Sequence, residues 1–215
     1  MANRSSPGFG ISSLTRALLG FTAQGYALAY FNRGVPYSDL GQYENAIDNY
    51  TKAIQLDPDY AKAYLNRGNA YDDLDQYQRA IQDYDKVIQL DPDNAFAYLN
   101  RGAAYEHLGQ YATALEDYDK AIQLGPDDAM ACFNRGISYH QLSGYATAID
   151  NYTKAIQLDL DYATAYFNRG YSYRMLGHDE KADADKAKAC SFWSFSPNLF
   201  SNNGNWAIRS MCQMP

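Results

Sequence analysis

The tripeptide Asn-Arg-Gly recurs five times in this chain at a constant interval of 34 residues. Its copies begin at Asn32, Asn66, Asn100, Asn134 and Asn168. A constant period of this length is typical of stacked supersecondary structures, in which each repeat covers the apolar face of its neighbour. The 215 residues are therefore expected to form one elongated array and not a single core closed on itself.

Each repeat is expected to hold two helices. In the repeat 61–94, apolar or small residues recur every three or four positions over 64–74 and again over 77–88. A short polar turn separates the two stretches. Gly41 and Gly109 mark the same turn in other repeats, where a residue in the left-handed conformation ends a helix.

Several positions carry the same residue type in most repeats. Counted from Ala27, position 8 is Gly, position 11 is Tyr and position 20 is Ala in all five repeats. Positions 4 and 24 are Tyr in four of the five. This pattern resembles the tetratricopeptide repeat, whose period is also 34 residues. The resemblance implies an all-α fold, a right-handed α-solenoid (superhelix) of stacked antiparallel helix pairs, in which small residues let paired helices approach and aromatic residues fill the surrounding space.

The predicted array covers residues 27–190. Residues 1–26 do not follow the repeat and are expected to be an N-terminal extension with a short capping helix at 13–19. The array divides into four full repeats and a degenerate fifth: 27–60, 61–94, 95–128, 129–162 and 163–190.

The tail, residues 191–215, differs in composition from the array. It contains both tryptophans of the chain, Trp193 and Trp206, and one charged residue, Arg209. Three interpretations stay open: an unstructured tail, an aromatic segment that folds onto the array, and a peptide foreign to the ancestral repeat, such as a shifted reading frame. The composition favours a tail that is mostly disordered.

Three departures from the family pattern carry structural expectations. Arg stands at position 7 of every repeat in place of Leu, and each Arg is expected to lay its stem on the packed surface and reach an acid or water. Pro36 lies inside the first helix, which should kink or begin late. Asp179 and Lys186 replace Tyr in the fifth repeat, so its second helix, 179–190, is expected to be polar and to act as a solvating cap.

The resemblance implies that the first helices line a concave groove, with positions 5 and 6 of each repeat facing a ligand. A side-chain amide both donates and accepts, so one Asn per repeat suits an extended peptide of any sequence. The opposing interpretation is that the Asn row is a relic of duplication. The predicted groove residues are an Asn row, an apolar row and one further Asn: Asn32, Asn66, Asn100, Asn134, Asn168, Phe31, Leu65, Leu99, Phe133, Phe167 and Asn69.

Charge favours a basic or neutral protein or peptide partner over an acidic one. At the groove positions, acidic residues outnumber basic ones: Asp39, Asp72, Asp73 and Glu106 against Lys62 and Arg174. The carboxylate clamp by which related arrays hold acidic peptides lacks its cations here. The net charge of −7 disfavours nucleic acid and anionic membranes as partners.

The residues that carry chemistry show no catalytic pattern. His107, His140 and His178 share no ligand spacing and are expected to be solvated helix-surface histidines. There is no phosphate-binding glycine loop, no HExxH and no nucleophile elbow. We therefore expect no enzyme activity, no metal and no cofactor.

The sequence thus predicts a non-catalytic scaffold or adaptor that binds an extended peptide or partner segment in its groove. The alternative is a self-associating assembly protein that pairs through its degenerate C-terminal end. The N-terminus is a poor secretory signal and no apolar run is long enough to span a membrane, so a cytoplasmic location is expected.

Overall fold

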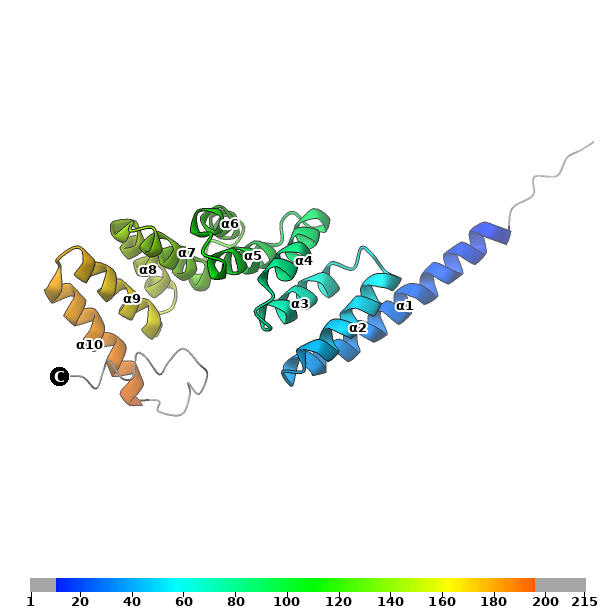
Figure 1. The fold of residues 1–215 in the computed structure, drawn as a ribbon, viewed down its shortest axis with the longest axis horizontal. Helices are drawn as coiled ribbons and strands as arrows, with labels where there is room; N and C mark the ends of the chain where they lie inside the picture. The colour runs from blue at the N-terminus through cyan, green and yellow to red at the C-terminus, as the bar shows by residue number, and fades with distance from the viewer. Residues whose placement is uncertain (1–10, 196–215) are drawn as a thin grey trace, which may run out of the picture. The chain divides into compact units, whose positions relative to one another are not determined.

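The structure, a computed structural model, describes the backbone of residues 11–195 and the side chains of residues 22–192. Within those residues all regular secondary structure is α-helical (Figure 1). The chain divides into two compact modules, an N-terminal module, Met1–Asp91, and a C-terminal module, Pro92–Pro215.

Each module is a stack of helix pairs. Consecutive helices contact each other within a module, and the first helices of neighbouring repeats also touch: α1 with α3, α5 with α7, and α7 with α9. This arrangement confirms the predicted all-α solenoid. The N-terminal module contains α1 (Ile11–Asp39), α2 (Tyr43–Leu56), α3 (Ala61–Asp72) and α4 (Tyr77–Leu90). The C-terminal module contains α5 (Ala95–His107), α6 (Tyr111–Leu124), α7 (Ala129–Gln141), α8 (Tyr145–Leu158), α9 (Ala163–Met175) and α10 (Asp179–Phe195).

The turn inside each helix pair contains one residue with a positive φ. A glycine takes this conformation in three repeats without steric cost. Non-glycine residues take it in the second and fourth repeats, so the prediction of a left-handed turn is confirmed in all five. The residues are Gly41, Asp75, Gly109, Ser143 and Gly177, with φ of 70°, 57°, 72°, 61° and 75°.

A tyrosine ring packed on a glycine joins the two helices of each of the first four repeats. The ring belongs to position 24 of the second helix and is at most 1% exposed in Tyr50, Tyr84, Tyr118 and Tyr152. A Cβ atom added at Gly102 would lie 2.7 Å from Cε1 of Tyr118. Only glycine therefore allows the helices to approach this closely, which confirms the expected role of the small residue at position 8.

The arginine at position 7 ties the same two helices together through polar contacts. In Arg101 the Nε and Nη2 atoms donate to the two carboxylate oxygens of Asp117 at 2.8 and 2.6 Å. Arg67 and Arg169 bind Asp83 and Asp185 in the same bidentate way. The prediction that each of these stems reaches an acid is confirmed in three repeats.

In the other two repeats an asparagine replaces the acid. Arg33 donates from Nε to Oδ1 of Asn49 at 2.6 Å, and Arg135 does the same to Asn151 at 2.7 Å. The Nη1 atom of Arg135 also donates to Asp119 of the preceding repeat at 2.6 Å. One guanidinium thus connects three helices, α6, α7 and α8, and contributes to the stacking of repeats as well as to the pair itself.

A buried carboxylate, Glu106, completes the polar contacts at the end of α5. Its Oε2 atom accepts from the hydroxyl of Tyr118 at 3.2 Å and from Oγ of Ser138 at 3.0 Å. Burial raises the pKa of Glu106 above its ordinary value, although both hydrogen bonds act in the opposite direction. Ser138 belongs to α7, so Glu106 connects two neighbouring repeats.

Both ends of the array differ from the sequence expectations. One continuous helix, α1, runs from Ile11 through Pro36 to Asp39, so it neither begins late nor follows a separate short helix. Proline lacks an N–H but keeps a helical φ, and the rest of the helix continues around it. The last helix, α10, continues to Phe195, beyond the expected end at residue 190. The predicted tail lies outside the described residues from position 196 onward.

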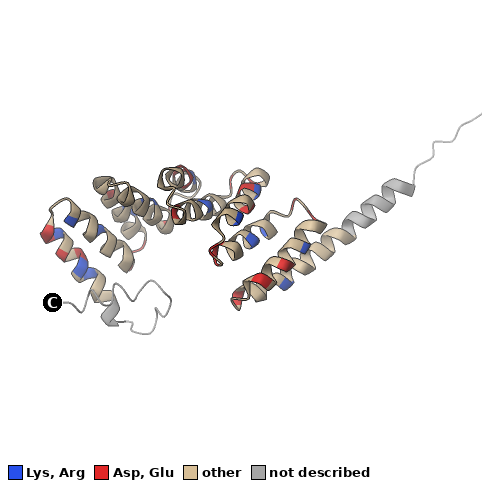
Figure 2. Cartoon of the chain, in the orientation of Figure 1, with Lys and Arg blue, Asp and Glu red and all other residues tan. Residues whose placement is uncertain are grey.

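The helix α10 keeps part of the repeat's packing face in spite of its charge. Ala182, Asp185 and Ala189 are buried against α9, while acidic and basic residues both occur along the helix (Figure 2). Its polar surface agrees with the expected capping helix.

The arginine contact generates a first prediction. Asp117→Asn should lower the free energy of unfolding by less than about 1 kcal/mol, because Asn49 and Asn151 accept from the same arginine Nε in their repeats. Asp117→Ala should cost about 2 kcal/mol or more, because it removes the acceptors of a largely buried guanidinium. Urea unfolding of the three proteins measures the difference, and equal losses in both variants would contradict the assigned role.

The buried carboxylate generates a second prediction. A raised pKa in the folded state stabilises the fold while Glu106 is protonated, below its ordinary pKa of 4.5, and this contribution is lost as pH rises through the raised value. Relative to Glu106→Gln, the wild type should therefore lose stability between pH 4.5 and neutral pH. Urea unfolding across this range tests the slope. Glu116→Gln, at an exposed position of α6, is the control for removing a carboxylate, and a flat difference for Glu106→Gln would refute the prediction.

Candidate functional site

The predicted Asn row lies at equivalent places on the first helices. In the C-terminal module, Asn100, Asn134 and Asn168 are half-buried on α5, α7 and α9, three helices that contact one another in sequence. In the N-terminal module, Asn66 is half-buried on α3 and Asn32 is exposed on α1. Each module therefore holds its Asn residues on one layer of neighbouring helices. The further predicted residue, Asn69, accepts a hydrogen bond from the hydroxyl of Tyr84 at 2.9 Å.

Much of the predicted apolar row is used for packing. The ring of Phe133 lies 5.8 Å from that of Tyr152 and 4.8 Å from that of Tyr162. Leu99 is 5% exposed and belongs to the core between α5, α6 and α7, so it offers almost no surface to a ligand.

The first repeat repeats this packing, since Phe31 contacts Tyr50 and Tyr60 at 5.7 and 5.1 Å. Leu65 is half-buried on α3. The remaining member of the row, Phe167, lines an open pocket instead of a filled space.

Two pockets adjoin the last member of the Asn row. The smaller has a volume of about 210 Å³ and lies among α7, α8 and α9. Its lining includes the first-helix positions at which the sequence predicted ligand contact in two successive repeats. The lining residues are Ile137, His140, Gln141, Tyr152, Asn168 and Tyr171.

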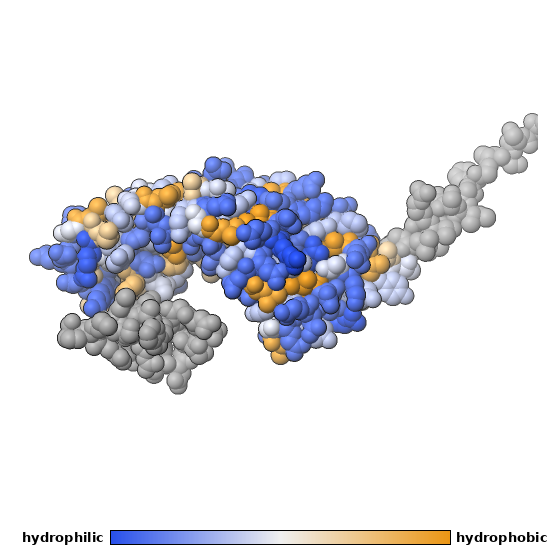
Figure 3. Space-filling model, in the orientation of Figure 1, coloured by the Kyte–Doolittle hydropathy of each residue, from blue (hydrophilic) through white to orange (hydrophobic). Residues whose placement is uncertain are grey.

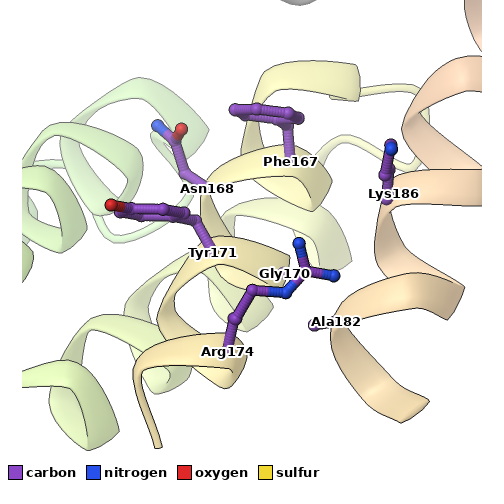
Figure 4. A pocket seen from close by; sticks show the side chains of 7 residues that line it. All are labelled: Phe167, Asn168, Gly170, Tyr171, Arg174, Ala182 and Lys186. Atoms are coloured by element: carbon purple, nitrogen blue, oxygen red, sulfur yellow. The ribbon is translucent and has the colours of Figure 1, made fainter. Parts of the chain in front are cut away.

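The larger pocket has a volume of about 410 Å³ and lies between α9 and α10 (Figure 4). Phe167, Gly170 and Arg174 reach it from α9, and Ala182 and Lys186 reach it from α10. In the close-up, Asn168 and Tyr171 extend from α9 on the side away from α10. These two residues line both pockets, so the pockets are adjacent on the surface of α9.

The environment of His140 corrects one expectation. Its Nδ1 lies 2.8 Å from Oγ of Ser172, and its ring packs 5.0 Å from Tyr145 and 5.1 Å from Tyr171. Burial lowers the pKa of His140, which favours the neutral ring. His140 is therefore a packed component of the smaller pocket and not a solvated histidine, whereas His107 and His178 are exposed as expected.

The contact between His140 and Ser172 has a counterpart one repeat earlier, in the pair Glu106 and Ser138. Both pairs join position 12 of one repeat to position 10 of the next and span 32 residues. The sequence carries this signal, because Ser replaces Ala or Asn at position 10 in the fourth and fifth repeats only, except for Pro36 in the first. The polar pairs connect neighbouring first helices beside the candidate site.

The charges on the candidate surface differ between the modules. In the N-terminal module, Asp72 and Asp73 end α3, and burial raises the pKa of Asp73. Around the larger pocket of the C-terminal module the charged lining residues are Arg174 and Lys186. The Nη2 atom of Arg174 also pairs with the exposed Asp183 of α10.

Two searches of the described part of the chain gave negative results. No group of three or more His, Cys, Asp or Glu side chains there is placed to hold a metal ion. None of its helices is both long enough and apolar enough to cross a membrane.

Similar solved structures share the helical stack. The crystal structure of MamA protein is 25% identical, with a TM-score of 0.72 over 83% of this chain and 97% of that one. The structure of YrrB, also 25% identical, has a TM-score of 0.68 over 86% of this chain and 93% of that one. MamA from Desulfovibrio magneticus RS-1 is 23% identical, with a TM-score of 0.75 over 80% and 97% of the two chains, and supports the fold alone.

Family comparisons agree with the structural ones. A family model described as TPR repeat matches residues 37–75 and 138–177, and one described as Tetratricopeptide repeat matches residues 61–94 and 95–128. A comparison with curated proteins found no match. The matched segments cover more than half of the sequence, follow the observed helix pairs and agree with the structural neighbours, so the chain belongs to the tetratricopeptide repeat family.

Proposed function

We propose that this protein is a non-catalytic interaction scaffold or adaptor that binds an extended peptide or partner segment along its first helices. The tetratricopeptide repeats and the structural neighbours support the coarser statement, a protein-interaction scaffold. YrrB is described as a TPR protein with an unusual peptide-binding site. The observation that carries the proposal is the Asn row on three neighbouring helices, which ends beside two pockets that share Asn168.

The spacing of the row suits an extended peptide. Packed helices lie about 8–10 Å apart, and an extended chain advances about 3.3 Å per residue. Amides on adjacent first helices would therefore meet a peptide about once every three residues. Because an amide can donate to a carbonyl and accept from an N–H, this contact depends on the ligand's main chain and not on its sequence. The half-buried position of Asn134 and Asn168 restricts their rotamers, which reduces the entropy lost on binding.

The charge preference forms part of the same proposal. Asp39, Asp72 and Asp73 lie at the ends of first helices in the N-terminal module, so a segment bound there should be basic or neutral. Glu106 is engaged by Tyr118 and Ser138 and contributes less to this preference than its sequence position implies.

The third prediction tests the Asn row. Peptides selected from a random display library for binding to the wild type should lose at least about tenfold in affinity when Asn66, Asn100 and Asn134 are all changed to Ala, a conservative estimate for three lost amide contacts. Calorimetry measures the affinity, and far-ultraviolet circular dichroism should show unchanged helicity.

The matched control replaces three side-chain amides on second helices of the same repeats, Gln89→Ala, Gln123→Ala and Gln157→Ala. All three residues are exposed, and the control should retain the wild-type affinity. If the Asn variant binds as well as the control, the row is not the binding surface.

Self-association is the second candidate, and the surface of the last repeat favours it. Met175 is 47% exposed at a position where the other four repeats have Asp, His or Gln. Leu176 beside it is 43% exposed. On the face drawn in Figure 3, apolar patches alternate with polar surface. A second copy that covers Met175 and Leu176 would remove apolar area from water, as a further repeat would in a longer array.

The fourth prediction separates this candidate from the first. If copies pair through the last repeat, Met175→Lys with Leu176→Lys should make the protein monomeric at concentrations where light scattering shows the wild type to be dimeric. Leu142→Lys changes the same repeat position as Leu176 one repeat earlier, with 49% exposure, and should leave the dimer intact. A wild type that is monomeric over the whole concentration range removes the candidate.

A further inference from the structure

The buried tyrosine of position 24 has the same three neighbours in the complete repeats. Its ring lies on the glycine of position 8, as the contact of Tyr118 with Gly102 shows. It also packs beside the aromatic residue of position 5, since the rings of Phe133 and Tyr152 lie 5.8 Å apart. Its hydroxyl points to position 12, because Tyr118 donates to Glu106. Positions 5, 8 and 12 of the first helix thus form a socket for a phenol ring.

The fifth repeat retains this socket without the ring. Position 24 is Lys186, and positions 5, 8 and 12 are Phe167, Gly170 and Arg174. These four residues line the pocket of about 410 Å³ between α9 and α10 (Figure 4). The pocket is therefore the space that a tyrosine fills in each preceding repeat. Its volume lies within the range of pockets that hold small ligands.

We propose that this socket binds a tyrosine side chain of a partner peptide, with an acidic residue next to that tyrosine. The ring would lie against Phe167 and Gly170, as the internal tyrosines do in their own repeats. Its hydroxyl oxygen would accept a hydrogen bond from the guanidinium of Arg174, which replaces Glu106 at the same position. The neighbouring carboxylate would pair with the ammonium group of Lys186.

The electrostatics of the pocket agree with this ligand. Arg174 pairs with Asp183, but the two side chains are exposed and the solvent weakens the pair. A guanidinium has five N–H donors, so one carboxylate leaves others for a phenol oxygen. The pocket thus has a local positive charge that differs from the acidic N-terminal module.

The composition of the chain argues for a separate partner. Residues 191–215, which follow the socket in the sequence, contain Phe and Trp but no Tyr, Asp or Glu. They lack both the phenol and the acid that the pocket's cations favour. The site is distinct from the Asn row at Asn66, Asn100 and Asn134, so the inference stands or falls independently of the proposed function.

The fifth prediction fills the socket from within. Lys186→Tyr restores the residue of the other repeats and should weaken binding of a blocked Glu-Tyr-Glu peptide at least about tenfold, because ligand and side chain compete for one space. The melting temperature should rise, since a ring fills an open volume. Fluorescence anisotropy of the labelled peptide measures binding, and Glu-Phe-Glu and Glu-Ala-Glu peptides should bind progressively more weakly than Glu-Tyr-Glu.

Matched variants make the result decisive. Lys188→Tyr introduces the same residue at an exposed position two residues along α10 and should retain the wild-type affinity. Arg174→Gln should weaken the tyrosine peptide several-fold and abolish its advantage over the phenylalanine peptide, and it decides the case if Lys186→Tyr misfolds. The triple Asn variant should bind the Glu-Tyr-Glu peptide normally, while Lys186→Tyr should bind the library-selected peptides normally.

Three outcomes would overturn the inference. They are failure of the wild type to bind the Glu-Tyr-Glu peptide, equal binding by Lys186→Tyr, and loss of self-association without peptide binding in the wild type. The last outcome would assign the socket to a second copy of this chain.

Discussion

The contact between a buried tyrosine ring and a glycine backbone is the constraint on which each helix pair depends. Because the ring of Tyr118 occupies the space of a missing Cβ at Gly102, the two helices approach closely and exclude water without a large aliphatic core. The same contact explains the exception. Where Lys186 replaces the tyrosine, the helices α9 and α10 still pair, but an open pocket lies between them.

Polar contacts complete what the tyrosine begins. The arginine of position 7 reaches the second helix of its own repeat, and Arg67, Arg135 and Arg169 also reach the preceding repeat at Thr51, Asp119 and Thr153. A guanidinium with several donors in a plane can satisfy two acceptors at once, which a lysine could not do in the same geometry. The pairing of helices and the stacking of repeats therefore share one side chain.

The sequence was a good guide wherever a residue acts within its own repeat. Gly at position 8, the turn residue at position 15 and the need of the arginine for an acceptor followed from local physical chemistry and recurred in each copy. It was a poor guide to surfaces made by several repeats. Leu99 and Phe133 share a repeat position with Phe167, yet only Phe167 lines an open pocket, because its neighbours at the end of the array differ. His140 was misjudged for the same reason, since its partners Ser172 and Tyr171 belong to the next repeat.

By itself, the sequence determined the family, the helix pairs and the residues at which paired helices meet, because a period of 34 residues repeats the same short-range constraints five times. Only the tertiary structure decided which of the repeated side chains remain accessible. Accessibility depends on atoms contributed by other helices, and the change from Tyr to Lys at position 186 becomes a socket only when Phe167, Gly170 and Arg174 surround the vacated space.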